Sequence, residues 1–357
     1  IDGGDMHINR QGAPKDVKGG KLRCYPGDVI FGKRRAYQRK AAIVDFDGIC
    51  SAHAFVLRAN KDVVNAKLFP FFLHSDQFMH RMVDISVGGL SPTINWGDLK
   101  NQEFLLPPKE EQNKLAELLW VMDDVIEQEQ LFLNKLKVYK KTRMINLLNG
   151  FNLVKDKDTL PDGWSIKKIK DLGVISTSSV NKKINHNEEN VNLLNYMDVY
   201  SSNDKKIDSR VNFMGVTANK NQLKTNQIAI GDVLFTPSSE TVDDIGHSAV
   251  VTEKMPHTLY SYHLVRLKFY EDMDLNFKRF VFNNPKILYY FSRRAKGVTR
   301  MTLSLEDFNE TKVRIPPLDT QNKIATELSV IIDNIMNSNS KISNSKAVMK
   351  SLINKIF

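Results

Sequence analysis

Gly231-Asp232-Val233-Leu234-Phe235 repeats an earlier stretch of the same chain, Gly27-Asp28-Val29-Ile30-Phe31, at an offset of 204 positions (231 − 27). Two further matches follow in the same order: Ser51-Ala52-His53 with Ser261-Tyr262-His263, and Pro107-Pro108 plus Gln112-Asn113-Lys114 with Pro316-Pro317 plus Gln321-Asn322-Lys323. A period of about 200 residues is much longer than the roughly 20–50 residues of solenoid or propeller repeats. The sequence therefore predicts two copies of a whole domain, each followed by a helix.

The composition is that of a soluble globular protein with a polyanionic partner. The chain has 357 residues, 41% hydrophobic and 26% charged, which favours two or three domains. It contains no run of about eighteen apolar residues that could cross a membrane. Cys24 and Cys50 are its two cysteines, too few for a disulfide framework or a four-cysteine zinc site, so we expect a reducing cytoplasm. The net charge of +10 suggests nucleic acid as a partner.

The repeat gives the expected domain boundaries. We expect a first domain at 1–108 and its helix at 109–150, then a second domain at 151–317 and its helix at 318–357. Residues 151–159 read as a linker rich in Lys and Asp. The second copy has 71 residues before Gly231 when counted from Leu160 (231 − 160), but the first has 26 before Gly27 (27 − 1). We therefore expect the N-terminal part of the first domain, about 45 residues (71 − 26), to be missing from this sequence.

Each copy reads as an α/β domain. Short β-branched and aromatic runs predict strands, a longer amphipathic stretch predicts a helix, and a double proline ends the last strand because it can continue neither ladder nor helix. The expected strands are 28–31, 41–44, 54–57 and 103–106 in the first copy, and 232–235, 248–252, 264–268 and 311–315 in the second. The expected helices are 68–82 and 276–292, each followed by a glycine-containing loop.

Both long helices carry an apolar seam with alternating steps of three and four residues, which is typical of a coiled coil. In the first helix the predicted seam is broken at Glu129 and contains Leu115, Leu118, Met122, Val125, Phe132, Leu136 and Tyr139. In the second it is broken at Ser338 and Ser345 and contains Leu328, Ile331, Ile335, Ile342, Met349, Leu352 and Ile356. Each helix of about forty residues is about 60 Å long at 1.5 Å per residue, which suits a spacer.

The charges predict the direction of helix pairing. Each helix is acidic in its first half and basic in its second, so antiparallel pairing would place opposite charges together. We therefore expect an antiparallel coiled coil with the two domains at opposite ends, related by a pseudo-twofold axis. The alternative is that the charges only solvate exposed faces, and that each helix packs on its own domain.

The duplicated motif set, in this order, resembles the specificity subunit of type I restriction-modification systems. Leu160-Pro161-Asp162-Gly163-Trp164 also looks like the opening of that family's target-recognition domains. The resemblance implies that each domain reads half of a split, asymmetric site in double-stranded DNA. It also implies that the helices set the gap and dock two methyltransferase subunits, with restriction/translocase subunits joining outside. S-adenosylmethionine, ATP and magnesium would belong to those partners, and this subunit would be non-catalytic.

Candidate DNA contacts are side chains that can read base edges or bind phosphates. In the first domain the basic loop after 27–31 is the leading candidate, together with a glycine-containing loop; the residues are Lys33, Arg34, Arg35, Gln38, Arg39, Lys40, Arg81, Thr93 and Asn95. In the second domain the equivalent loop has hydroxyls and a carboxylate, and cations lie nearby; the residues are Ser238, Ser239, Glu240, Thr241, Arg293, Arg294, Lys296 and Arg300. A solvated charged turn is the alternative for the first loop.

Three other functions compete with this one. An enzyme is disfavoured because the phosphate-binding Gly-x-x-x-x-Gly-Lys-Ser/Thr signature is absent, and Asn284-Pro285-Lys286 lacks the second proline and the aromatic of an amino-methyltransferase. His53 and His263 have no ligand cluster beside them, so we expect no metal and a structural role. A coiled-coil adaptor that does not bind DNA, and a related system with fused methyltransferase and nuclease, stay open.

Overall fold

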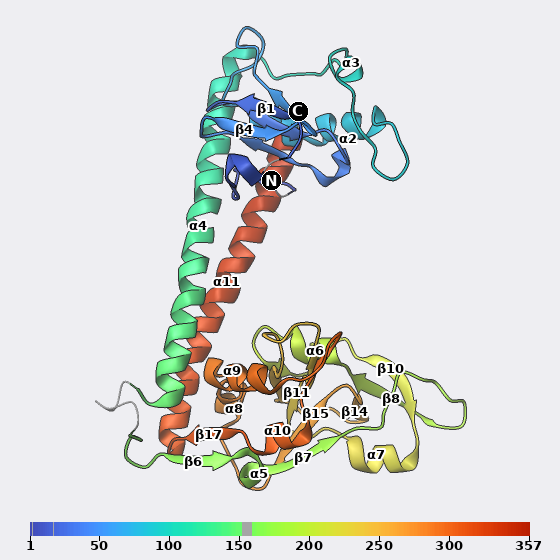
Figure 1. Ribbon diagram of the computed structural model, residues 1–357, viewed down its shortest axis with the longest axis vertical. Coiled ribbons are helices and arrows are strands. Elements are labelled where there is room, and N and C mark those ends of the chain that lie inside the picture. Colours follow the sequence, from blue (N-terminus) through green and yellow to red (C-terminus); the bar gives the residue numbers. More distant parts are fainter. Residues whose placement is uncertain (2, 17, 152–158) are drawn as a thin grey trace. The chain divides into compact units, whose positions relative to one another are not determined.

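The computed structural model describes residues 1, 3–16, 18–151 and 159–357, which fall into two units. Unit 1 comprises Ile1–Leu133 and Asn337–Phe357, and unit 2 comprises Asn134–Met336. Each unit contains one α/β domain and about half of each long helix, α4 (Lys109–Asn149) and α11 (Leu318–Ile356) (Figure 1). The α/β class and the duplicated domain were both predicted correctly. The expected linker lies largely outside the described residues.

A three-stranded antiparallel sheet occurs in both units with the same strand order. In unit 1 the order is β3 (Ala41–Ile43), β2 (Val29–Gly32) and β5 (Ala54–Leu57). In unit 2 the same positions are taken by β13 (Ser248–Val251), β11 (Val233–Phe235) and β15 (Val265–Phe269). The central strands are equivalent in register, because Phe31 pairs with Ala41 and Phe55 while Phe235 pairs with Ser248 and Val265. The predicted strands of this sheet are therefore confirmed.

The repeated Gly-Asp pair is explained by the turn that starts each central strand. Gly27 and Gly231 have φ of 90° and 87°, a left-handed conformation that glycine adopts without steric cost. The following aspartate closes the turn: Asp28 Oδ2 accepts from the Tyr25 N–H at 2.9 Å, and Asp232 Oδ2 accepts from the Ala229 N–H at 3.0 Å. The motif is therefore part of the scaffold in both copies.

Each single helix expected after this sheet is in fact two helices. Unit 1 has α1 (Phe69–His74) and α2 (Asp76–Asp84), and unit 2 has α8 (Leu275–Val281) and α9 (Pro285–Arg294). The break has the same cause in both: a polar side chain caps the second helix. Ser75 Oγ accepts from the Phe78 N–H, and Asn284 Oδ1 accepts from the Lys286 N–H. Short segments α3 (Trp96–Leu99) and α10 (Leu305–Asn309) follow the glycine-containing loops.

The strand expected at 103–106 is wrong. Its counterpart β17 (Lys312–Ile315) pairs antiparallel with β6 (Ser165–Lys168), at the start of the second copy. In the part of the chain that the structure describes, no segment pairs with 103–106, and these residues are not a strand. Leu105 is consequently 81% exposed. An apolar run cannot form a strand without a partner for its backbone groups.

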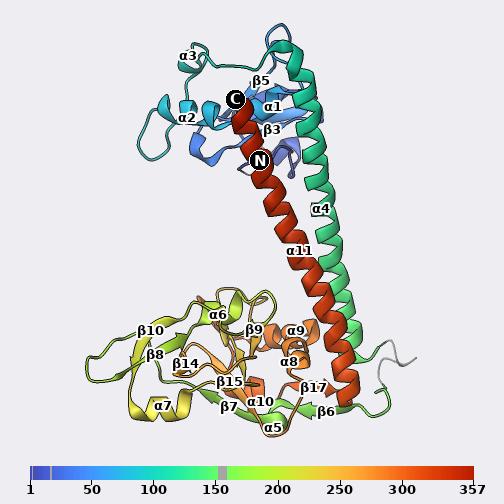
Figure 2. The ribbon, with the colours of Figure 1, turned by 180° about the vertical axis from the view of Figure 1, so that it is seen from behind.

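The remaining elements differ between the units. Unit 1 adds η1 (Pro14–Asp16), η2 (Ala36–Gln38) and a pair of strands, β1 (Lys21–Cys24) and β4 (Gly48–Ser51). Unit 2 extends the central sheet with β7 (Gly173–Thr177) and β9 (Lys206–Ile207), and adds a second sheet of β10 (Met214–Ala218), β8 (Glu189–Leu194) and β14 (Thr258–Tyr260). It also contains α5 (Ile169–Leu172), α6 (Tyr196–Tyr200), α7 (Lys220–Asn226), β12 (Ser238–Ser239) and β16 (Met301–Thr302). Figures 1 and 2 show α7, β8 and β10 at the end of unit 2 that is farthest from its segments of α4 and α11.

A buried glutamine joins each long helix to its own domain. Gln112 accepts from the Asn65 N–H at 2.7 Å and donates to the Pro107 carbonyl at 3.0 Å. Gln321 accepts from the Asp274 N–H at 3.0 Å and donates to the Pro316 carbonyl at 2.9 Å. The repeated Pro-Pro…Gln motif thus fixes the first turn of the helix against the double proline.

The long helices pair antiparallel in each unit, as their charges predict. In unit 1 the Ser338 hydroxyl donates to Glu129 Oε1 at 2.7 Å, and in unit 2 Arg143 pairs with Glu327 at 2.6 Å. Residues early in one helix therefore contact residues late in the other. Arg143 lies in the basic half of α4 and Glu327 in the acidic half of α11. Gly150, with φ of 71°, follows the last residue of α4 and ends the helix.

The predicted seam is confirmed for four of its seven residues on α11 and is wrong by one residue on α4. The other three α11 residues, Ile335, Leu352 and Ile356, are half-buried. On α11, Leu328, Ile331, Ile342 and Met349 are buried, and so is Ser338. On α4 the predicted Val125 and Phe132 are 57% and 51% exposed, and the buried seam runs through Ala116, Leu119, Asp123, Ile126 and Leu133. The pattern misled because Asp123 occupies a core position, where His7 Nε2 pairs with its carboxylate at 2.6 Å. None of the helices among the described residues is long and apolar enough to span a membrane.

Candidate DNA interface

The basic loop of unit 1 connects β2 to β3. The Gly32 N–H donates to the Lys40 carbonyl at 2.8 Å and closes the loop at its base. Inside it the 3₁₀ turn η2 is bounded by Arg35 and Arg39, with φ of 55° and 51°. The left-handed region is uncommon for residues other than glycine. The surrounding structure must therefore impose this backbone conformation on the two arginines. Ala36 is buried, whereas the Arg34 and Arg35 side chains are exposed.

The structure brings this loop against the glycine-containing loop, which contains other candidate DNA contacts. Arg34 forms a β-bridge with Thr93. The Arg35 N–H donates to the Pro92 carbonyl at 2.7 Å, and the Ile94 N–H donates to the Lys33 carbonyl at 2.8 Å. Four of the candidate residues therefore form one cluster on unit 1: Lys33, Arg34, Arg35 and Thr93. Asn95 follows Ile94, which is bonded to the same loop, and its side chain donates to Asp98 at 3.4 Å.

The other unit 1 candidates are Arg39 and Arg81, which have partners within the protein, and Gln38 and Lys40. Arg39 forms an ion pair with Asp76 and donates to the His74 carbonyl at 3.5 Å, so it ties the loop to α1 and α2. Arg81 Nη1 donates to Gln102 Oε1 at 3.2 Å. Gln38 and Lys40 are half-buried. Gln38, Arg39 and Lys40 are therefore less available to DNA than Arg34 and Arg35, whereas Arg81 is exposed as they are.

The equivalent loop of unit 2, residues 236–247, is longer and differs in chemistry. Ser238 and Ser239 form β12, which pairs with β16, and both side chains are largely buried. Arg300 Nε donates to Ser238 Oγ at 3.1 Å, so a predicted cation does lie beside the loop. Glu240 and Thr241 are exposed, as are Arg293, Arg294 and Lys296.

A network that the sequence analysis missed supports the unit 2 loop. Tyr200 donates to Asp244 Oδ2 at 2.5 Å, and His247 Nε2 lies 2.7 Å from Asp244 Oδ1. Tyr196 donates to the Ser238 carbonyl at 2.8 Å and stacks on Tyr200. Burial lowers the pKa of His247, which keeps this ring neutral near pH 7. The two tyrosines four residues apart, on one face of a helix, were the signal in the sequence.

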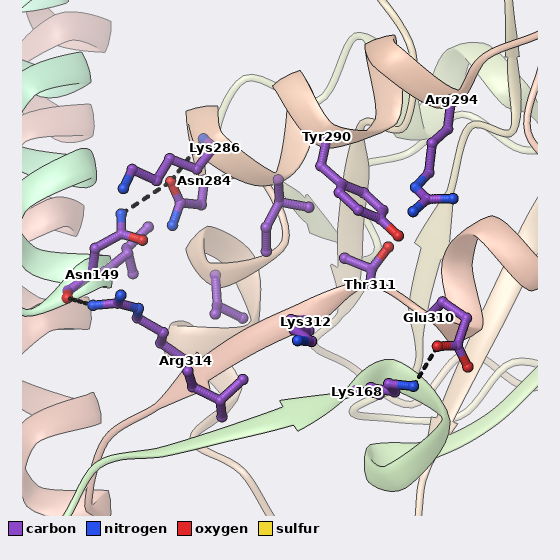
Figure 3. A pocket seen from close by; sticks show the side chains of 14 residues that line it. Asn149, Lys168, Asn284, Lys286, Tyr290, Arg294, Glu310, Thr311, Lys312 and Arg314 are labelled. Atoms are coloured by element: carbon purple, nitrogen blue, oxygen red, sulfur yellow. Dashed lines mark hydrogen bonds and ion pairs between the residues drawn. The ribbon is translucent and has the colours of Figure 1, made fainter. Parts of the chain in front are cut away.

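A basic recess of about 700 Å³ lies on unit 2 between α9 and the β6–β17 pair (Figure 3). Its charged lining residues are Lys168, Lys286, Arg294, Glu310, Lys312 and Arg314. The ammonium groups of Lys168 and Lys170 hold the pKa of Glu310 at about 2. Arg314 donates to the Asn149 carbonyl at 2.7 Å, at the end of α4, where a cation complements the helix dipole. Arg294 points into this recess and is one of the predicted DNA contacts.

The motifs considered for enzyme chemistry have scaffold roles. Asn284-Pro285-Lys286 begins α9, with Asn284 as its cap. In the Ser-x-His motif the backbone N–H of His53 donates to Ser51 Oγ at 3.2 Å, and that of His263 donates to Ser261 Oγ at 3.3 Å. Among the described residues no group of three or more His, Cys, Asp or Glu side chains could hold a metal ion.

The fold is shared with solved specificity subunits. A structure of the type I restriction-modification system matches with a TM-score of 0.57 at 17% identity, covering 94% of this chain and 82% of that one. The S subunit from M. genitalium matches with a TM-score of 0.54 at 12% identity, covering 93% and 83%. At these identities the likeness establishes the fold alone: two α/β domains with two long helices.

The family follows from the sequence comparison. The model of the type I restriction modification DNA specificity domain matches residues 17–138 and 161–345, so this chain belongs to that family. The specificity subunit of the type I restriction enzyme MjaIX from Methanocaldococcus jannaschii is 22% identical over 376 residues, covering 96% of this chain and 79% of that protein. The family resemblance drawn from the repeated motifs is therefore confirmed.

Proposed function

We propose that this chain reads a split, asymmetric site in double-stranded DNA, one half-site with each domain, and that it does no chemistry itself. In this proposal residues 1–108 and 151–317 are the two target-recognition domains. Residues 109–150 and 318–357 are the helices that set the gap. Methyltransferase subunits, and restriction/translocase subunits with them, assemble on this chain in the cytoplasm and hold S-adenosylmethionine, ATP and magnesium.

One observation carries the proposal: the two domains keep the same scaffold but present different loops. Asp28 and Asp232 close the same turn, and Gln112 and Gln321 make the same pair of hydrogen bonds. On this shared frame the β2–β3 loop presents exposed arginines, whereas the β11–β13 loop presents Glu240 and Thr241. Arginine pairs best with guanine and phosphate, and glutamate accepts from cytosine, so the two loops suit different base sequences.

The distribution of charge supports a DNA partner. Phosphate contacts from Lys and Arg supply most of the affinity of a protein for DNA, and base contacts supply the sequence preference. The exposed cations of unit 1 and of unit 2 lie next to the loops that differ, so both kinds of contact are available at the same places.

The test is to co-express the chain with its methyltransferase subunit in a host without this system, and to map methylated adenines across the genome. We expect one asymmetric motif in two parts, separated by a fixed number of unspecified bases. The methyltransferase expressed alone is the control. A continuous or palindromic motif, or the same methylation without this chain, would overturn the proposal, and methylation by this chain alone would overturn its non-catalytic part.

A further inference from the structure

Each unit contains a glycine hairpin of the same construction. The unit 1 hairpin (residues 87–93) is closed by a bridge between Val87 and Thr93, and the unit 2 hairpin (residues 296–302) by a bridge between Lys296 and Thr302. The offset is 209 at both closing positions (296 − 87 and 302 − 93). Gly88 and Gly297 turn the chain with φ of 108° and 147°. At Gly297 a Cβ would lie 2.0 Å from the Arg300 carbonyl oxygen, so this tight turn requires glycine.

Both hairpins present an aliphatic side chain to solvent at the tip. Leu90 and Val298 are each 98% exposed, and no other large hydrophobic side chain in the described part of the chain is as exposed. They occupy adjacent positions of the same turn. A single exposed leucine is ordinary in proteins. Two maximally exposed aliphatic residues in the same turn of two domains with different sequences indicate a shared use.

The tips are held in place by the candidate DNA loops. In unit 1 the hairpin is bonded to Arg34 and Arg35 through Thr93 and Pro92. In unit 2 the β12–β16 pairing joins the hairpin to Ser238 and Ser239, and the Leu303 N–H donates to the Pro237 carbonyl at 2.9 Å. Each apolar tip therefore projects from a fixed base.

The surroundings of the tips are cationic. Arg34 and Arg35 flank the unit 1 hairpin, and the unit 2 hairpin itself contains Lys296 and Arg300. A polyanion that also offers apolar surface suits this combination: in a DNA groove the phosphates lie at the edges and the bases form the floor. Apolar side chains contact thymine methyl groups in the major groove, and in the minor groove they insert between successive base pairs.

We propose that Leu90 and Val298 are specificity-determining residues that enter a DNA groove and contact bases, Leu90 in one half-site and Val298 in the other. This inference rests on the proposed function and adds residues of a different kind to the polar and cationic candidates. The cations hold the phosphates on either side, and the tip contacts the floor between them.

The experiment uses the chain in complex with its methyltransferase subunits. The variants are Leu90→Ser and Val298→Ser, and the probe is a synthetic duplex carrying the bipartite site mapped by methylation. We expect each variant to lose roughly tenfold in affinity, in line with the loss of one base contact. The slope of log affinity against log salt should not change, because no phosphate contact is removed. Genome-wide methylation should relax in one half-site for each variant, and in opposite halves for the two.

Controls separate a base contact from a loss of folding. Leu90→Met keeps an apolar tip and should bind like the wild type. Val63→Ser and Ile230→Ser remove exposed aliphatic side chains away from the hairpins, at 54% and 55% exposure, and should have no effect. Wild-type affinity in both Ser variants, or equal loss on a scrambled duplex, would overturn the inference. If the wild-type complex itself does not prefer the bipartite duplex, the proposed function fails instead.

Discussion

The loops after β2 and β11 follow equivalent central strands that begin with the same kind of turn, yet the two loops are built differently. The unit 1 loop is short, rich in Arg and Lys, and contains two arginines in the left-handed conformation. The unit 2 loop is longer and is supported by Tyr196 and Tyr200 of α6. The unit 1 loop is thus held by backbone hydrogen bonds to the glycine-containing loop and by the ion pair of Arg39 with Asp76, whereas side chains of a neighbouring helix support the unit 2 loop.

This difference shows where a duplicated scaffold is free to vary. The residues that repeat include Asp28 with its equivalent Asp232, and Gln112 with its equivalent Gln321. Each accepts a hydrogen bond from, or donates one to, a backbone group that would otherwise be unpaired in its own domain. The loops between them have no such obligation in common. Their side chains can therefore change with the DNA that each domain reads.

The largest expected effect comes from removing charge in the unit 1 loop. In the assembled complex, Arg34→Gln combined with Arg35→Gln should lower DNA affinity about 10- to 100-fold near 0.15 M salt, and reduce the slope of log affinity against log salt by up to about two. Ser239→Ala combined with Thr241→Ala in unit 2 is the matched control and should leave the slope unchanged. Equal slopes for both double variants, measured by titration at several salt concentrations, would remove the proposed contrast between the loops.

A smaller effect on affinity, but a clear one on sequence preference, is expected at Glu240. Its carboxylate is exposed at the end of β12 and can accept from cytosine. Glu240→Gln should relax one position of the unit 2 half-site by roughly tenfold and leave the unit 1 half-site unchanged. Mapping of methylated adenines with the variant complex measures the sequence preference in both half-sites in one experiment. Relaxation in both, or in neither, would show that Glu240 does not read a base.

The support of the unit 2 loop can be tested through stability. Tyr200→Phe removes the hydrogen bond to Asp244 and should lower the free energy of unfolding of unit 2 by about 1 kcal/mol. Tyr289→Phe is the control, because Tyr289 is 67% exposed, and should change little. The free energy of unfolding of each unit in each variant can be measured by urea titration, with amide hydrogen exchange as the probe. No loss in the Tyr200 variant would mean that α6 does not hold the loop.

The smallest expected effects are opposite pH dependences in the two units. The hydrogen bond and charge of Asp123 raise the pKa of His7 above 6.5, so its contribution to unit 1 is present below pH 6.5 and is lost as the pH rises through the folded-state pKa. Burial lowers the pKa of His247 below 6.5, so the unfolded chain binds the proton more readily, and unit 2 loses stability as the pH falls below 6.5.

These dependences can be measured as urea midpoints of each unit between pH 5 and 8.5, with His7→Gln and His247→Gln as comparisons. Each variant should flatten the profile of its own unit only. A variant whose profile keeps the wild-type shape would show that the histidine makes no pH-dependent contribution.

Much of the fold could be predicted because the repeated motifs are local. Gly27 and Asp28 determine a turn within four residues, and the spacing of apolar residues on α11 predicts the buried Leu328, Ile331, Ile342 and Met349. The site could be predicted in part: Lys33, Arg34 and Arg35 do meet the loop containing Thr93. The prediction was weaker for side chains whose availability to DNA depends on a partner distant in sequence. Arg39, which pairs with Asp76, is such a case.

The sequence by itself determined the duplication, the α/β class, the antiparallel helices and the family, because each depends on patterns repeated along the chain. Only the tertiary structure decided that 103–106 is not a strand, that the α4 seam passes through Asp123, and that Tyr200 supports the second loop. The reason is physical: a strand needs a partner, and a buried carboxylate needs a counter-charge. The described residues offer 103–106 no such partner, and the partner of Asp123, His7, lies far away in sequence and is close only after folding.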